Sequence, residues 1–146
     1  MGRIQMKTRM GVAVMAGAMA TAPAANAAEE LFRPLPAEAR DLGDMRWEKR
    51  PILVFAPAQS DPDYVRQMDL LRAAEAALAE RDIVVLSDLD DRTPSPLRQG
   101  FQPGGFKIVL VGKDGGVKLE RDDVTAPEDL MALIDTMPMR IREAAE

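Results

Sequence analysis

Beyond residue 50, apolar residues cluster in three short and nearly continuous runs. The runs cover residues 51–56 (PILVFA), 83–86 (IVVL) and 106–111 (FKIVLV). A run of this length is typical of a β-strand that is covered on both faces. Residues 117–121 (VKLER) instead alternate apolar and charged positions, which indicates a strand with one face in water. The pattern therefore predicts four strands, the last of them on the outside.

Between the first two runs, apolar residues recur every three or four positions, which predicts an amphipathic helix. Asp61 is a suitable N-cap and Pro62 suits the first helical position, and we expect the helix to end near residue 80 or 81. A strand–helix–strand crossover is right-handed, so the first two strands should be parallel. The apolar face comprises Tyr64, Met68, Leu71, Ala74 and Leu78.

The last two strands are expected to form a hairpin. Residues 114–115 (DG) are a strong turn signal, because a type I′ turn needs positive φ at two successive positions. A two-residue turn places Leu110 opposite Leu119 and Gly112 opposite Val117, and we prefer it. A three-residue loop that uses the next glycine would place Leu119 beside Val111.

The final segment predicts a second helix. Thr125 and Glu128 form a capping box, and Pro138 should end or kink the helix. Residues 139–146 are expected to form a short helical tail. The apolar face is formed by Leu130, Leu133, Ile134 and Met137.

Two segments lack a clear period. Residues 28–50 mix charges and prolines with scattered apolar positions, and we expect a helical turn near residues 36–41. Residues 88–105 are punctuated by prolines and glycines, and there Thr93 could cap a short helical piece that Gly100 ends. Connections this long are often functional or mobile.

The order is therefore βαβ, a long connection, and ββα. It predicts an α/β domain with a four-stranded mixed sheet and flanking helices, which is the minimal thioredoxin-like arrangement. A truncated flavodoxin-like fold fits the same pattern. We expect a lead-in over residues 28–46 and one domain over residues 47–146, in keeping with the chain length. Trp47, the only tryptophan, is expected to cover one end of the core.

The first 27 residues have the features of a secretory signal peptide. Three of the first nine residues are basic, residues 10–20 are small and apolar, and residues 25–27 (ANA) fit a signal-peptidase site. The alternative is a membrane helix, but the apolar run is well short of the roughly 18 residues that spanning needs. We therefore expect a soluble periplasmic or secreted product that begins at Ala28 and does not insert in the membrane.

Composition excludes several classes of chemistry. The expected mature chain has 16 basic and 24 acidic residues, a formal charge of −8, and neither cysteine nor histidine. A chain this acidic should repel nucleic acid and anionic lipid. Without cysteine it has no thiol nucleophile, CxxC pair or thiolate metal site. Without histidine, an acid–base catalyst would have to be a carboxylate, lysine or tyrosine with a shifted pKa.

Four segments together resemble one family: RWEKRPILVFAP (46–57), ERDIVVLSD (80–88), FKIVLVGKDGGVKL (106–119) and IDTMPMR (134–140). The chain is similar to the P-DUDES family, a domain of unknown function in bacterial exported proteins. Related domains occur in the vertebrate extracellular-matrix protein "down-regulated by oncogenes". The resemblance implies a thioredoxin-like, somewhat peroxiredoxin-like fold and no established activity.

The resemblance also implies where a site would lie. In redox-active proteins of this fold, the reactive cysteine sits where the first strand of the βαβ unit meets its helix, and a cis-proline often faces it. Here that loop holds Gln59 and Ser60 and no cysteine, and Pro103 is the candidate proline. The helix N-terminus could receive a small anion there. The alternative is that Asp61 already caps the helix and cancels much of its field.

Two further groups are candidate sites. Asp88, Asp90 and Asp91 could hold Ca²⁺ or pair for acid–base work. Their spacing lacks the glycine and the distal glutamate of a calcium loop, which favours a solvated acidic loop. The second group comprises Lys113, Lys118 and Arg140, which could bind a carboxylate or an acidic partner surface. Turn chemistry explains the residues around the hairpin without any ligand.

We therefore expect a non-redox thioredoxin-like module that binds an envelope protein or a small ligand, and no nucleic acid. No cofactor or metal is expected. The alternative is a carboxylate- or metal-dependent enzyme that uses the acidic loop 88–91. Thiol redox activity is excluded by the absence of cysteine.

Overall fold

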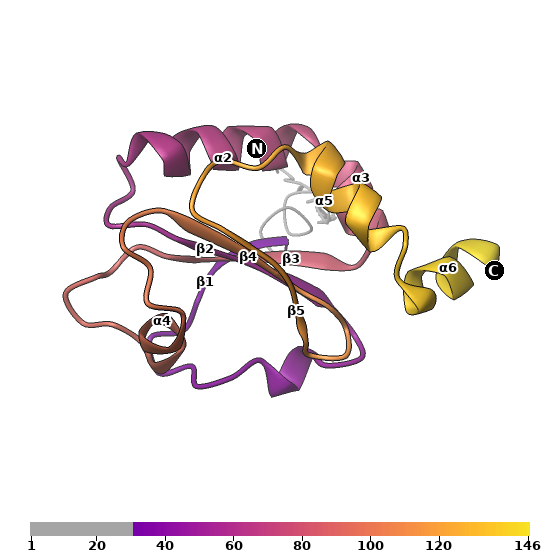
Figure 1. Cartoon of the computed structure of the whole chain (residues 1–146), viewed down its shortest axis with the longest axis horizontal. Coiled ribbons are helices and arrows are strands. Elements are labelled where there is room, and N and C mark those ends of the chain that lie inside the picture. The colour runs from indigo at the N-terminus through magenta and orange to yellow at the C-terminus, as the bar shows by residue number, and fades with distance from the viewer. Residues whose placement is uncertain (1–30) are drawn as a thin grey trace, which may run out of the picture.

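The computed structural model describes residues 31–146, so the expected signal peptide over residues 1–27 lies outside the described part. Five strands form one mixed sheet in the order β1-β3-β2-β4-β5, and helices cover both of its faces (Figure 1). The strands are β1 (Phe32–Pro34), β2 (Arg50–Phe55), β3 (Ile83–Asp88), β4 (Lys107–Val111) and β5 (Val117–Arg121). No helix among the described residues is both long and apolar enough to cross a bilayer.

The pairing of the strands confirms the predicted α/β class. β2 and β3 are parallel, β4 is antiparallel to β2, and β5 is antiparallel to β4. The number of strands is one more than predicted, because β1 in the lead-in pairs in parallel with β3 and places Phe32 opposite Val85. Three residues that end in a proline are too few to show a strand period in the sequence.

The sheet separates two apolar layers. Alternate residues of β2 enter opposite layers: Ile52 and Val54 face the first, and Leu53 and Phe55 face the second. The first layer is covered by α2 (Pro62–Ala73), α3 (Glu75–Glu80) and α5 (Pro127–Ile134), and the second by η1 (Gly43–Met45) and α4 (Pro96–Phe101). The short α6 (Pro138–Ala145) forms the C-terminal end. Burial on both faces explains the continuous apolar runs.

The crossover holds two helices where the sequence predicts one. The predicted cap is confirmed, since the side chain of Asp61 accepts the N–H of Tyr64 at 3.0 Å. The break falls at Ala74, with φ −105° and ψ 19°, and α3 ends at Glu80 as expected. The residues around Ala74 are strong helix formers, so local propensity contains no signal for this break.

The hairpin confirms one predicted pair and changes another. Leu110 lies opposite Leu119, as predicted. Val117, however, faces Val111 instead of Gly112, and the register shifts between Leu110 and Val111. The loop therefore holds three residues, and a bulge in the strands absorbs the difference.

Gly115 is required by this loop. Its φ is +88°, its N–H donates to the carbonyl of Gly112 at 3.0 Å, and an added Cβ would lie 2.8 Å from Nη2 of Arg46. We expect Gly115→Ala to lower the free energy of unfolding by about 1–2 kcal/mol, measured by urea denaturation. Gly104→Ala is the control, because a Cβ there meets no atom of the described residues within 4 Å apart from its chain neighbours. Equal losses in the two variants would contradict this role of Gly115.

Helix α4 is capped differently from the prediction. Ser95 is the N-cap instead of Thr93, and its Oγ accepts the N–H of Arg98 at 3.0 Å. Gly100 lies inside the helix, which ends with Gln102 in the left-handed conformation.

The predicted capping box of α5 is wrong. Among residues 31–146, no side chain caps this helix. Thr125 is buried against α2 instead: its N–H donates to Oε1 of Gln67 at 2.8 Å, and its carbonyl accepts Nε2 of Gln67 at 2.9 Å. This reciprocal pair ties α2 to the loop that precedes α5.

Trp47 does not cover the core. Its side chain is 59% exposed, and its φ is +71°, a conformation that is strained for a bulky residue. Its N–H donates to the carbonyl of Lys113 at 2.6 Å, which fixes residues 46–49 against the hairpin. The aromatic side chain therefore lies at the surface.

Candidate functional site

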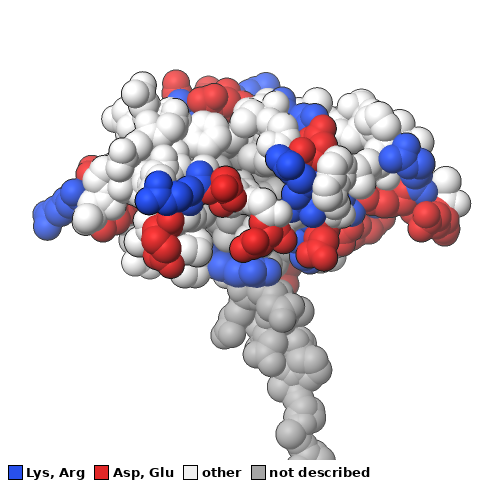
Figure 2. Space-filling view, turned by 90° about the horizontal axis from the view of Figure 1, so that it is seen from below, with Lys and Arg blue, Asp and Glu red and all other residues white. Residues whose placement is uncertain are grey.

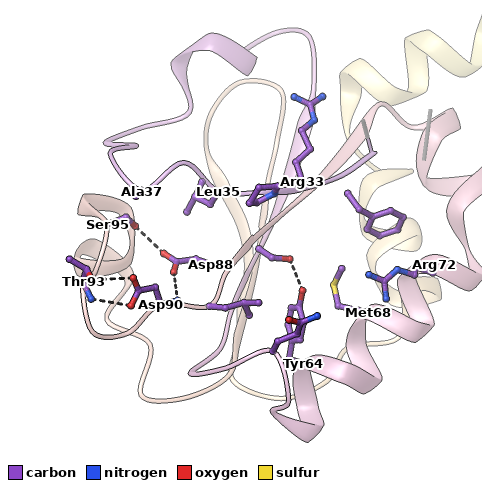
Figure 3. A pocket seen from close by; sticks show the side chains of 15 residues that line it. Arg33, Leu35, Ala37, Tyr64, Met68, Arg72, Asp88, Asp90, Thr93 and Ser95 are labelled. Atoms are coloured by element: carbon purple, nitrogen blue, oxygen red, sulfur yellow. Dashed lines mark hydrogen bonds between the residues drawn. The ribbon is translucent and has the colours of Figure 1, made fainter. Parts of the chain in front are cut away.

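A cleft of about 500 Å³ opens at the carboxyl ends of the parallel strands, beside the start of α2 (Figure 3). Open α/β sheets bind ligands in this region, because loops there leave a crevice. Its lining comes from β1, the loop that follows β1, α2, and the end of β3 with the loop behind it. Side chains that line it include Phe32, Ala37, Gln59, Tyr64, Met68, Arg72, Ser87, Asp88, Asp90 and Thr93.

The cleft is fixed by side-chain contacts between its walls. The hydroxyl of Tyr64, on α2, donates to Oγ of Ser87 at the end of β3 at 3.1 Å (Figure 3). The guanidinium of Arg72 lies 5.5 Å from the ring centre of Phe32, which connects α2 to β1. Such contacts preorganise a cleft, so less ordering is needed when a ligand binds.

One end of the cleft contains a buried ion pair. Asp88 and Arg98 are 8% and 5% exposed, and Nη1 of Arg98 donates to Oδ1 of Asp88 at 2.8 Å. Arg98 also donates to the carbonyl oxygens of Asp88 and Ala56, at 3.0 and 3.1 Å. The guanidinium therefore joins the ends of β2 and β3, directly before the loop that holds Gln59 and Ser60.

Sequence reasoning missed Arg98. The available signal was Ser95-Pro96, a cap followed by a proline at the first helical position, which would have started α4 there. With Thr93 as the assumed cap, the sequence does not show which face of α4 packs against the sheet, and so it does not show that Arg98 points inward.

Hydrogen bonds within the acidic loop after β3 hold its carboxylates in turns. Oδ1 of Asp88 accepts the N–H of Asp90 at 3.1 Å, and Oδ2 accepts the hydroxyl of Ser95 at 3.1 Å. Asp90 accepts the N–H groups of Thr93 and Arg92, and these hydrogen bonds lower its pKa. Among residues 31–146, no three acidic side chains are grouped so that they could hold a metal ion.

The predicted loop site is only partly assembled. Gln59 lines the cleft, whereas Ser60 is exposed and is not part of its lining. Pro103 is half-buried and is not part of the cleft lining, and the described residues contain no cis peptide bond. Asp61 caps the helix, so its carboxylate occupies the N-terminal N–H that an anion would use.

The predicted basic group lies at the other end of the molecule. Lys113 donates to Asp82 at 2.8 Å and to Glu143 at 2.6 Å, and Lys118 pairs with Asp114 at 3.0 Å. Burial opposes the charged form of Lys113, but these hydrogen bonds outweigh it and raise the pKa of Lys113.

Arg140 does not join the two lysines. Its guanidinium pairs with Glu80 at 3.1 Å and with Asp135 at 3.4 Å. Lys113 and Arg140 connect distant parts of the chain through their ion pairs, whereas Lys118 pairs within the hairpin. Because all three cations have carboxylate partners, they leave little charge for a ligand.

These ion pairs predict how stability depends on pH. Burial would raise the pKa of Glu143, but hydrogen bonds from Lys113 and Arg50 lower it, and Arg81 lowers the pKa of Asp135. A carboxyl with a lowered folded-state pKa stabilises the fold above its unfolded pKa of about 4 and loses that contribution as pH falls. We expect the melting temperature, followed by circular dichroism, to fall between about pH 5 and pH 2.

Glu143→Gln is the test of that assignment. The variant should be less stable at pH 7 and should show a shallower fall below pH 5, since one titrating group has been removed. An unchanged pH dependence would contradict the role of Glu143.

Comparisons with known proteins identify a family, and the solved structures among them share this architecture. A family model described as a domain of unknown function (DUF4174) matches residues 41–143. A search of curated proteins found no match. Thioredoxin-2, described as a component of malaria parasite protein secretion machinery, is 22% identical, with a TM-score of 0.50 over 61% of this chain and 84% of that chain.

Two peroxidases of the same fold are also similar. The reduced 2-Cys peroxiredoxin of Plasmodium vivax is 13% identical, with a TM-score of 0.53 over 69% of this chain and 84% of that chain. Thioredoxin peroxidase I of Plasmodium yoelii is 14% identical, with a TM-score of 0.51 over 69% of this chain and 79% of that chain. Identities this low establish a thioredoxin-like fold and nothing about activity.

Proposed function

This chain belongs to the DUF4174 family and has a thioredoxin-like fold, and on that premise we propose that it is an exported, non-redox binding module of the cell envelope. The observation that carries the proposal is the corner between β2 and α2. The loop there has Gln59 and Ser60 but no cysteine, and the buried Arg98–Asp88 pair joins the strand ends next to it. A scaffold of this kind retains a cleft for binding and lacks a thiol nucleophile.

The family relation can be extended in one respect. We propose that this family is the P-DUDES group of exported domains. The four segments that carry that resemblance span residues 46–140, which lie almost entirely within the matched range of 41–143.

Export is supported by the basic, apolar and small-residue pattern of the first 27 residues. The periplasm or the medium is therefore where we expect the protein. Sequencing the N-terminus of the protein recovered from these fractions should find Ala28 as the first residue. Recovery only from the cytoplasm with the leader intact would overturn this part of the proposal.

The alternative, an enzyme that uses the carboxylates of residues 88–91, has less support. Asp88 is held by Arg98 and Ser95, and the hydrogen bonds to Asp90 keep its pKa low, whereas a general acid or base needs a pKa near the operating pH.

Binding can be tested with a variant that fills the cleft. Ala37 lines the mouth and is exposed, so Ala37→Trp should obstruct the cleft without disturbing the core. The immobilised protein should retain a specific set of envelope molecules, identified by mass spectrometry, and Ala37→Trp should lose at least tenfold of that retention. Ala132→Trp is the matched control, since Ala132 is exposed on α5, outside the cleft.

Two results would oppose the proposal. One is equal retention by Ala37→Trp and the unchanged protein. The other is turnover of a substrate that a single side-chain change abolishes. Insulin reduction and peroxide consumption should stay at the level of buffer, because both reactions need a thiol.

A further inference from the structure

A second pocket lies on the opposite face of the sheet from α2. Its volume is about 360 Å³, and it is enclosed by residues 40–51, α4 and the β4–β5 hairpin. It shares no residue with the cleft at the strand ends. The pocket is therefore separate from the site of the proposed function.

The floor of this pocket is apolar. Met45, Leu97 and Phe101 pack against the second core layer, and Val111 is buried beneath them. Val117 lies at the mouth and is 50% exposed. Clefts of a few hundred Å³ with this mixture of apolar floor and a few polar groups are typical of small-molecule sites.

Three cations line the same pocket: Arg40, Arg46 and Lys49. Each lacks an ion-pair partner among residues 31–146, whereas seven other lysines and arginines in that range are paired with carboxylates. The acidic residue in the lining is Asp41, whose Oδ1 accepts the N–H of Gly43 at 2.9 Å. The pocket thus has an excess of positive charge in a chain whose net charge is negative.

The position of Arg46 depends on a glycine. Its Nη2 and Nε lie 2.8 and 2.9 Å from the place that a Cβ at residue 115 would occupy. The guanidinium therefore rests directly on the backbone of Gly115, and a larger residue would displace it. The conformation of the hairpin turn and the position of the Arg46 guanidinium therefore depend on each other.

From this combination we propose that the pocket binds a single anionic amphiphile, a molecule with one carboxylate, sulfate or phosphate headgroup and an apolar chain. The chain would lie on Met45 and Phe101, and the headgroup would meet the guanidinium and ammonium groups at the mouth. Guanidinium groups bind such headgroups through two hydrogen bonds.

An anionic bilayer or a polyanion fits this part of the molecule less well than a single small molecule does. On the face seen in Figure 2, acidic and basic side chains are interspersed and no continuous basic area is present. The whole chain has a formal charge of −5, which opposes approach to anionic bilayers and polyanions. One headgroup at one pocket avoids that repulsion.

The test uses decanoate below its micelle concentration as the probe, with isothermal titration calorimetry on the purified protein. Decanoate should bind at least tenfold more tightly than decyltrimethylammonium, which has the same chain and the opposite charge. Arg46→Gln should weaken decanoate binding about tenfold, which corresponds to one charge-assisted hydrogen bond.

Val117 and Val65 provide a matched pair of variants. Both are exposed valines, at 50% and 44%, and Val65 lies on α2, outside the pocket. Val117→Glu should abolish decanoate binding, Val117→Lys should retain or strengthen it, and Val65→Glu should leave it unchanged. The substitutions alter exposed positions, so the fold should persist, as circular dichroism will show.

Three outcomes would overturn this inference: equal binding of the cationic and anionic probes, equal effects of Val117→Glu and Val65→Glu, or binding to phosphatidylglycerol vesicles without binding to decanoate. The last would identify a membrane surface as the occupant. These results leave the proposal for the cleft at the strand ends untouched, because the cleft and this pocket share no residue. For the same reason, Ala37→Trp should leave decanoate binding intact.

Discussion

Arg98→Met is expected to lower the free energy of unfolding by about 3–5 kcal/mol, because it leaves the buried carboxylate of Asp88 without its cation. The variant also leaves the carbonyl oxygens of Ala56 and Asp88 without the donors that now lie at 3.1 and 3.0 Å. Methionine keeps the unbranched apolar part of the side chain and removes the guanidinium, so the loss reports mainly the charge and its hydrogen bonds. Since a domain is usually stable by only about 5–15 kcal/mol, this is a large fraction.

Urea denaturation measures the loss, and Arg92→Met is the control. Arg92 lies in the same region but is exposed, so its replacement should change stability by less than about 0.5 kcal/mol. In a double-mutant cycle with Asp88→Asn, we expect a coupling energy of about 0.5–3 kcal/mol. Additive effects, or a loss below about 1 kcal/mol for Arg98→Met, would show that the ion pair does not hold the strand ends together.

Gln67→Met should lower the free energy of unfolding by about 2–4 kcal/mol, since it strands two buried backbone groups of Thr125. Gln67 is fully buried, and its amide makes hydrogen bonds of 2.8 and 2.9 Å with that N–H and carbonyl. Methionine is similar in size, so little cavity is created. Native-state hydrogen exchange provides a second measurement, in which protection of the Thr125 amide should fall more than that of the β4 amides.

The matched variant for this prediction is Gln99→Met. Its amide also donates to a backbone carbonyl, that of Pro94 at 3.1 Å, but at an exposed position where water can replace it. Little change is expected there. If Gln99→Met and Gln67→Met were equally destabilising, burial of the amide would not be the reason for its importance.

Much of this fold could be predicted because its strong signals are local. The continuous runs in β2, β3 and β4 identify strands covered on both faces, and Asp61 identifies the start of α2. The features that were missed depend on contacts between distant residues. The spacing between Thr125 and Glu128 is typical of a capping box. In the structure, however, the backbone N–H of Thr125 donates to the buried amide of Gln67, and the capping box does not form.

Candidate sites were harder to predict for a similar reason. The sequence indicated where a loop such as the one at Gln59 would lie, because that position follows from the order of elements. It could not indicate which charges neutralise each other. Lys113 appears available in the sequence and is paired twice in the structure. Arg46 was not among the predicted site residues, yet it lines a pocket and has no ion-pair partner within the described part of the chain.

The exposed position of Trp47 has a practical consequence for spectroscopy. It is the only tryptophan, and with 59% of its surface in water its emission in the folded protein should already resemble that of a solvated indole. Intrinsic fluorescence should therefore change little on unfolding. A shift of the emission to shorter wavelength would instead report a molecule that covers the ring. The tryptophan can therefore serve as an intrinsic fluorescent probe of ligands that bind beside the hairpin.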